Sequence, residues 1–135
     1  RVTESDSYVD FIEGLGGLEI KVGLYHGDFA PWNIKISDDG EVCVLDWEHA
    51  RLDGLGGWDW LHYMTQHGTL VSNHSAIEVL TECRLWASTS EGRSFLSAAG
   101  WGRYTEEWLG SYLMYSAWIA GFERDELLQA WSDGV

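Results

Sequence analysis

A turn signal between two β-prone runs is the feature that most constrains how this chain can fold. Residues 34–37 (IKIS) alternate apolar and polar side chains, residues 38–41 (DDGE) carry an Asp-Gly pair, and residues 42–45 (VCVL) are β-prone. An Asp-Gly pair between two such runs is a strong signal for a β-hairpin with a two-residue turn, because both central residues of that turn need a positive φ. We therefore expect a hairpin that turns at Asp39 and Gly40.

The register of this hairpin determines which polar residues meet at its open end. With Asp39 and Gly40 as the turn, counting outward places Asn33 directly opposite Asp46. Directly opposed residues have Cβ atoms roughly 4.5–5.5 Å apart, so both side chains can contact one cation. A shift of one residue would instead send Asp46 to the other face. The sequence thus predicts a metal site made by Asn33 and Asp46.

One polar motif precedes the hairpin and a second ends it. Residues 26–33 (HGDFAPWN) fit H-x-D-x-x-x-x-N, the catalytic-loop pattern of kinases, in which the Asp accepts the proton of the substrate hydroxyl and the Asn holds a metal. Residues 44–48 (VLDWE) place a lone carboxylate, Asp46, at a strand end. Carboxylate and amide oxygens suit Mg²⁺, which usually binds one or two protein groups together with substrate phosphates. The two motifs together predict phosphoryl transfer, with Asp28 facing the substrate hydroxyl as general base.

Both motifs resemble those of the aminoglycoside phosphotransferase and choline kinase superfamily, which has a protein-kinase-like fold. The resemblance covers about residues 23–63. It implies an α+β, mainly helical C-terminal lobe in which a small β-hairpin carries the metal site. It also implies that Asp28 is the catalytic base and that Asn33 and Asp46 bind Mg²⁺. Asp59 resembles the later Asp of the family, which opens a helix and buttresses the catalytic loop. Members use ATP or GTP to phosphorylate hydroxyls of aminoglycosides, choline, ethanolamine, homoserine or sugars.

Other residues near the motifs have several interpretations. His26 is expected to shape the loop rather than to perform chemistry, because its place in the pattern is positional. Glu48 is a candidate for an additional metal ligand, and Trp32 for contact with a cationic ligand, because aromatic faces attract cations. His62 and His67 are five residues apart and do not share a helix face as zinc ligands would, so ordinary helix histidines are expected there.

The segment before the first motif is short for a complete kinase. Only 25 residues precede His26, too few for the lobe whose glycine-rich loop and strand lysine cover the nucleotide phosphates. Residues 14–17 (GLGG) do not fit G-x-G-x-x-G and are typical of a helix stop. We expect residues 1–135 to form a single domain, the C-terminal lobe of a longer phosphotransferase. Without the N-terminal nucleotide lobe, the chain is expected to be weak or inactive.

The composition limits the kinds of partner. The chain has 22 acidic and 8 basic residues and a formal net charge of −14, which argues against nucleic acid or an anionic membrane as partner. The charge suits a cationic substrate such as an aminosugar or a quaternary amine, with simple solubility as the alternative explanation. No apolar run approaches the ~20 residues of a membrane span. The two cysteines lack metal-ligand spacing and indicate reduced thiols, so we expect a cytoplasmic protein.

The remaining segments have mainly helical patterns. A stripe of apolar and aromatic residues predicts that the longest helix packs on the core, with a wall of a ligand site as the alternative; its members are Trp108, Tyr112, Tyr115, Ile119 and Phe122. Residues 53–57 (DGLGG) are typical of a flexible turn, and residues 88–93 of a loop. Helices are predicted over residues 4–13, 58–66, 75–86, 102–122 and 123–131, and a short strand over residues 24–25.

Three functions remain open. The first, which we favour, is an ATP-dependent (or GTP-dependent) phosphotransferase lobe that transfers the γ-phosphate to a hydroxyl of a small molecule: an aminoglycoside, a choline-like cation or a sugar. The second is a non-catalytic kinase-like module that binds a protein or metabolite. The third is a metal-dependent phosphohydrolase, which is less favoured because such enzymes need more ligands than Asn33 and Asp46 provide.

Overall fold

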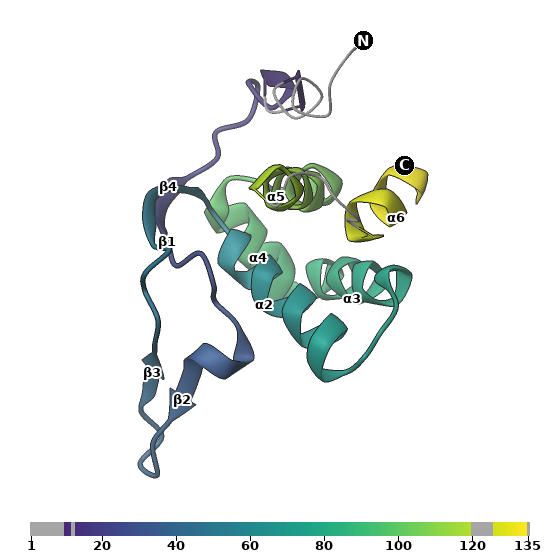
Figure 1. Cartoon of the computed structure of the whole chain (residues 1–135). Coiled ribbons are helices and arrows are strands. Elements are labelled where there is room, and N and C mark those ends of the chain that lie inside the picture. The colour runs from purple at the N-terminus through teal and green to yellow at the C-terminus, as the bar shows by residue number, and fades with distance from the viewer. Residues whose placement is uncertain (1–9, 12, 120–125, 135) are drawn as a thin grey trace.

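The structure is a computed structural model that describes residues 10–11, 13–119 and 126–134. Two small antiparallel β-sheets precede a group of helices, so the chain is α+β and mainly helical, as the sequence predicts. Figure 1 shows the helices gathered on one side and the hairpin of residues 34–44 projecting away from them. None of the described helices is long and apolar enough to cross a bilayer.

The first sheet leads into the polar loop. Strand β1 (Val22–Tyr25) pairs antiparallel with β4 (Arg51–Leu55), which places Gly54 opposite Gly23. The flexible turn predicted over residues 53–57 is therefore wrong for residues 53–55, which belong to β4, whereas Gly56 and Gly57 do form a turn. Gly54 is in the strand for a packing reason: a Cβ there would overlap the side chain of Tyr25. Glycine inside a strand often marks such a close approach.

The second sheet is the expected hairpin, but its predicted register is wrong by one residue. Strand β2 (Ile34–Ile36) pairs with β3 (Val42–Val44), so that Lys35 faces Cys43. The loop has three residues instead of two and ends at Gly40, whose φ of 85° is left-handed. The Gly40 amide donates to the Ser37 carbonyl over 2.9 Å. A left-handed glycine closing a three-residue loop is the next most common hairpin connection after the two-residue turns.

The helices follow the predicted pattern with three main differences. Helix α5 begins at Thr105 instead of residue 102, and a π-helical segment over His67–Val71 was not predicted. Residues 88–93 do not form a loop: α3 ends at Ser88 and α4 begins at Ser90. Thr89 makes this tight break possible because its hydroxyl accepts a hydrogen bond from the Gly92 amide at 3.0 Å, capping α4. The elements are η1 (Pro31–Asn33), α2 (Trp58–Gln66), the π-helical η2 (His67–Val71), α3 (Ala76–Ser88), α4 (Ser90–Ala99), α5 (Thr105–Ile119) and α6 (Glu126–Gly134).

Three of the predicted helices lie partly outside the described residues. Of residues 4–13, Asp10, Phe11 and Glu13 are described and are helical, and the helix extends to Gly14. Residues 120–125, which include the predicted end of the longest helix and the start of the last, are not described.

The core forms where α2, α3, α4 and α5 pack together, and the contact of α2 with α5 is the one that bears on the polar loop. Trp108 and Tyr112 of the predicted stripe are buried and Ile119 is 61% exposed, while Phe122 lies outside the described residues. The Trp58 ring stacks on Tyr115 with centroids 4.4 Å apart, and Trp58 Nε1 donates to the Ser111 hydroxyl at 3.0 Å. These contacts between α2 and α5 help to position His62 and Tyr112, whose side chains meet between the two helices.

Candidate active site

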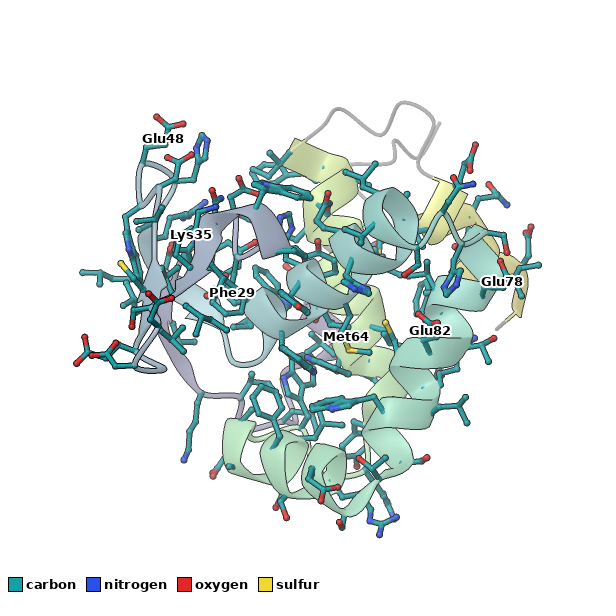
Figure 2. All side chains as sticks on the ribbon, turned by 90° about the horizontal axis from the view of Figure 1, so that it is seen from below. Phe29, Lys35, Glu48, Met64, Glu78 and Glu82 are labelled. Carbon is teal, nitrogen blue, oxygen red and sulfur yellow. The ribbon has the colours of Figure 1, made fainter. Side chains whose placement is uncertain are left out.

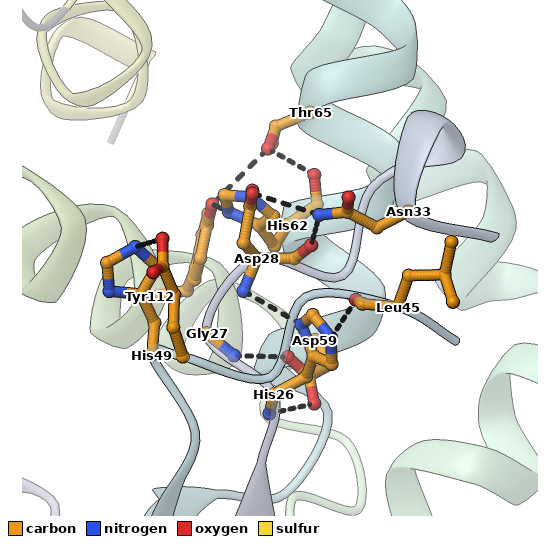
Figure 3. Close-up of polar contacts among 11 residues, drawn as sticks. His26, Gly27, Asp28, Asn33, Leu45, His49, Asp59, His62, Thr65 and Tyr112 are labelled. Atoms are coloured by element: carbon orange, nitrogen blue, oxygen red, sulfur yellow. Dashed lines mark hydrogen bonds and ion pairs between the residues drawn. The ribbon is translucent and has the colours of Figure 1, made fainter.

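Asp28 lies in the loop between β1 and β2, where Asn33 from the same loop holds it. Asn33 Nδ2 donates to Asp28 Oδ2 at 3.0 Å and to the Asp28 carbonyl at 2.9 Å (Figure 3). The turn η1 brings Asn33 back toward Asp28, and Pro31 starts this turn with the φ that it requires. Both hydrogens of the Asn33 amide point to Asp28, so the amide oxygen is the group that Asn33 can still offer to a cation.

Asp59 ties this loop to the start of α2. Its Oδ2 accepts a hydrogen bond from the His26 amide at 2.8 Å, and its Oδ1 accepts one from the Gly27 amide at 3.3 Å. Gly27 has a φ of 88°, and a Cβ there would lie 2.6 Å from the His49 carbonyl oxygen. The loop thus depends on a glycine that is both left-handed and closely packed.

His26 connects the loop to the open end of the hairpin. Its side chain is buried, and its Nδ1 accepts a hydrogen bond from the Asp28 amide at 3.1 Å. Nε2 must then carry the ring proton, and it donates to the Leu45 carbonyl at 2.8 Å. The Trp47 ring packs edge-on against His26 with centroids 4.5 Å apart. These contacts fix the position of the loop relative to the segment that contains Asp46.

His62 is the site residue that sequence reasoning missed. It lies on α2, and its Nε2 is 2.9 Å from Asp28 Oδ1. Its Nδ1 is 2.8 Å from the hydroxyl of Tyr112 on α5. A carboxylate only accepts, so Nε2 donates to Asp28 and Nδ1 of the neutral ring accepts from Tyr112. The signal was available: Asp59 and His62 are three residues apart, which places both on the same face of α2.

Asp46 does not lie where the predicted register placed it. The Leu45 amide donates to the Asn33 carbonyl at 2.8 Å, so Leu45, rather than Asp46, lies across from Asn33. Asp46 follows with a left-handed φ of 62° and is exposed. Aspartate is one of the few residues that adopts this conformation readily. Strand pairing therefore does not bring Asp46 opposite Asn33, and the backbone turn at Asp46 sets the direction of its side chain instead.

The two remaining candidates lie at the surface. Glu48 forms an exposed ion pair with His49, with 3.3 Å between Glu48 Oε1 and His49 Nε2. Trp32 belongs to η1 and is 44% exposed. Neither side chain joins the hydrogen-bonded group around Asp28 that Figure 3 shows.

The residues near Asp28 offer few ligands for a metal ion. In the described part of the chain, no group of three or more His, Cys, Asp or Glu side chains could hold a metal ion. The amide oxygen of Asn33 and the exposed carboxylate of Asp46 are the groups that could bind Mg²⁺, which uses one or two protein ligands when phosphates complete its shell.

A cavity of about 490 Å³ opens beside Asp28, between β4 and α5. Aromatic side chains form much of its wall. Burial raises the pKa of Tyr25 above its ordinary value, and nearby Tyr112 and Asp59 raise it further, so the Tyr25 hydroxyl stays protonated. The lining residues are Tyr25, Gly27, Asp28, His49, Arg51, His62, Tyr112, Tyr115, Ser116 and Ile119.

Comparisons of this chain with protein-family models, with curated proteins and with solved structures found no match. The function must therefore be inferred from the residues of the site and from their geometry.

Proposed function

We propose that the chain is the catalytic lobe of a phosphotransferase, which transfers the γ-phosphoryl group of a nucleoside triphosphate to a hydroxyl of a small molecule. The observation that carries the proposal is the Asp28 carboxylate, which faces a cavity while two donors hold it. Asn33 binds one carboxylate oxygen from the loop, and His62 binds the other from α2. A carboxylate fixed in this way beside a small-molecule cavity is the arrangement that a general base requires.

Asp28 would act on the acceptor hydroxyl. Each of its oxygens accepts one hydrogen bond from the protein and keeps a further lone pair. When the hydroxyl oxygen attacks the γ-phosphorus, its proton passes to one of these lone pairs and the bond to the leaving nucleoside diphosphate breaks. Catalysis of this kind depends on positioning more than on covalent chemistry. The two donors support it because they restrict rotation of the carboxylate.

Asn33 and Asp46 would hold Mg²⁺ with the nucleotide phosphates. The ion would supply positive charge that offsets the negative charge of the phosphates. What this chain contributes is the orientation of the amide. The Nδ2 group of Asn33 is committed to Asp28, so the base and the proposed metal ligand are positioned by the same pair of hydrogen bonds.

The test is phosphoryl transfer from Mg²⁺–ATP or Mg²⁺–GTP to a panel of small hydroxyl compounds. It uses the natural full-length protein, with the 135-residue chain assayed in parallel. Asp28→Asn keeps the shape of the side chain but removes the base, so transfer should fall about 10²–10⁴-fold while nucleotide affinity is retained. Asp38→Asn, in the exposed hairpin loop, is the matched control and should leave transfer unchanged. Undiminished transfer by Asp28→Asn would refute the proposed base.

The same experiment separates the alternatives. Asp46→Asn should remove Mg²⁺-dependent nucleotide binding if Asp46 is a metal ligand. Saturable nucleotide binding without transfer to any hydroxyl would favour a non-catalytic binding module. Release of phosphate from simple phosphomonoesters without a nucleotide would favour a phosphohydrolase.

A further inference from the structure

A second cavity, of about 630 Å³, lies where the end of α3, the helix α4 and the start of α5 meet. Among the described residues, it shares no lining side chain with the cavity beside Asp28. Arg84 of α3, Arg93 of α4 and Arg103 of the connection to α5 line it. Three of the eight basic residues of the chain therefore surround one cavity.

The charge of this cavity is opposite to the charge of the whole chain. Glu106 is the one acid among the described residues that line it, so three arginines accompany one carboxylate. The chain as a whole has 22 acidic and 8 basic residues. Figure 2 shows acids on opposite sides of the molecule, with Glu48 on the side of the hairpin and Glu78 and Glu82 on α3. A local excess of arginine in such an acidic chain favours an anionic ligand.

Two of the three arginines are held in place by the protein. Arg84 Nε and Nη2 donate to the two carboxylate oxygens of Glu106 at 2.7 and 3.0 Å. Arg93 Nη1 donates to the carbonyl of Ser88, at the end of α3, over 2.6 Å. These contacts use only part of the five N–H groups of each guanidinium. Because both side chains are already restrained, a ligand loses little binding free energy to their ordering.

Arg93 and Arg103 have no carboxylate partner among the described residues. Arg103 lies over the ring of Tyr104, with 5.5 Å between its Cζ and the ring centroid, and this contact leaves its N–H groups available to a ligand. Glu106 compensates the charge of Arg84, so two positive charges at the cavity remain uncompensated. Like charges repel one another, and a bound anion would offset this repulsion.

The donors of the cavity suit a phosphate group. Guanidinium groups donate pairs of parallel hydrogen bonds to phosphate oxygens, and such charge-assisted bonds are short and strong. Ser97 and Thr105 also line the cavity, and their hydroxyls can donate. A phosphorylated hydroxyl carries about −1.5 to −2 charges at pH 7, which matches two uncompensated arginines. The volume lies within the ~300–1,000 Å³ range of small-ligand sites, so an organic group can accompany the phosphate.

A polyanion fits this part of the molecule less well than a small anion. Nucleic acid or an anionic membrane would extend beyond the cavity and meet the surface of a chain with a net charge of −14, which repels it. A small anion contacts the arginines alone. We propose that this cavity is a second ligand site, which binds a small phosphate dianion, as the free ion or as the phosphate group of a small molecule. The proposal does not depend on phosphoryl transfer at Asp28.

Titration of the 135-residue chain with glycerol 3-phosphate, inorganic phosphate and glycerol tests the proposal. Binding is followed by NMR chemical shifts at constant ionic strength and without Mg²⁺, so that the proposed Mg²⁺–nucleotide site does not contribute. Both phosphates should shift the signals of Arg93, Ser97 and Arg103 saturably, and glycerol should not. Tighter binding of glycerol 3-phosphate would identify a phosphorylated molecule as the ligand, and tighter binding of phosphate the free ion.

Variants of the two uncompensated arginines show whether they bind the ligand. Arg93→Gln and Arg103→Gln should each weaken phosphate binding about tenfold, the effect of losing a hydrogen bond to a charged group. Arg103→Lys keeps the charge but not the planar fork and should recover only part of the affinity. Lys35→Gln removes the same charge from the exposed hairpin and is the matched control, with unchanged affinity expected.

Several outcomes would overturn the proposal. The absence of saturable shifts at the three arginines of the cavity is one, and shifts confined to the loop of Asp28 are another. An equal loss of affinity in Lys35→Gln would show a response to net charge rather than a site. Tighter binding of a single-stranded oligonucleotide or of anionic vesicles through the same arginines would replace the small ligand by a polyanion. If Arg93→Gln unfolds the chain, which circular dichroism would show, Arg103→Gln decides, because it breaks no hydrogen bond with a described residue.

Discussion

His62 Nε2 lies 2.9 Å from Asp28 Oδ1, and this contact joins the helical part of the molecule to the polar loop. Tyr112 on α5 holds the opposite ring nitrogen of His62 at 2.8 Å. Asp28 is therefore oriented from two directions, by Asn33 within its loop and by His62 from α2. Packing between α2 and α5 thus controls the geometry of the proposed base.

Removing the His62 side chain should lower the rate of phosphoryl transfer. In His62→Ala, Asp28 loses one of its two side-chain donors and can rotate, so we expect kcat to fall about 10–100-fold, the usual effect of a misplaced group. The KM for the nucleotide should change little. His62→Gln retains an N–H donor and should recover part of the loss. Steady-state kinetics of the three proteins provides the measurement, and equal losses in both variants would show that the hydrogen bond is not the cause.

Alanine at Gly27 should destabilise the fold more than alanine at Gly40. Both glycines are left-handed, with φ of 88° and 85°. Each substitution should cost roughly 1–2 kcal/mol for the backbone conformation. At Gly27 the added Cβ would also lie 2.6 Å from the His49 carbonyl oxygen, whereas at Gly40 nothing lies within 4 Å. We expect Gly27→Ala to lower the free energy of unfolding by about 1–3 kcal/mol more than Gly40→Ala does. Urea denaturation gives both values, and equal losses would mean that the close contact has no energetic weight.

The ion pair between Arg84 and Glu106 should make stability depend on pH in the acid range. Hydrogen bonds from Arg84, at 2.7 and 3.0 Å, hold the pKa of Glu106 below its ordinary value of 4.5. A carboxyl group whose pKa is lower in the folded chain than in the unfolded chain stabilises the fold at pH values above the unfolded pKa. This stabilisation is lost as the pH falls from about 4.5 through the folded pKa. The pair is partly exposed, so its contribution should be roughly 0.5–1 kcal/mol.

Glu106→Gln tests this dependence. Its free energy of unfolding should be lower than that of the wild type at pH 7, and the difference should shrink toward pH 3. Glu107→Gln, at the neighbouring position of the same helix, is the control. If the difference in free energy of unfolding between Glu106→Gln and wild type stays constant between pH 7 and pH 3, the Arg84–Glu106 ion pair is not the cause of the pH dependence.

The two cysteines should differ in reactivity. Burial raises the pKa of the Cys83 thiol to about 12, whereas Cys43 is exposed on β3. Because the thiolate is the reactive form, a thiol reagent at pH 8 should modify Cys43 alone in the native chain and both cysteines in denaturant. Cys43→Ser should then show no rapid reaction in the native state. Rapid modification of native Cys83 would indicate that the core between α2 and α3 opens readily.

Local patterns predicted the elements whose signals lie within one segment. Helix α2 has the predicted bounds, and the capping box formed by Ser75 and Glu78 fixes the start of α3. The predictions of secondary structure were wrong where tertiary contacts determine the conformation of a segment. The segment 53–57 resembles a turn because of its glycines, yet pairing with β1 and packing on Tyr25 make most of it a strand. Thr89 and Gly92 form a cap that a polar run does not reveal.

The sequence by itself determined that Asp28 and Asn33 share one short loop, that a hairpin follows it, and that Asp59 opens a helix. These features depend on residues close in the chain, and turn and cap chemistry is local. The tertiary structure alone decided that Leu45, not Asp46, faces Asn33, because a one-residue difference in the loop shifts every pair of the hairpin. It also decided that His62 binds Asp28, since that contact requires Tyr112, which is 50 residues from His62 in the chain and meets it only where α2 packs on α5.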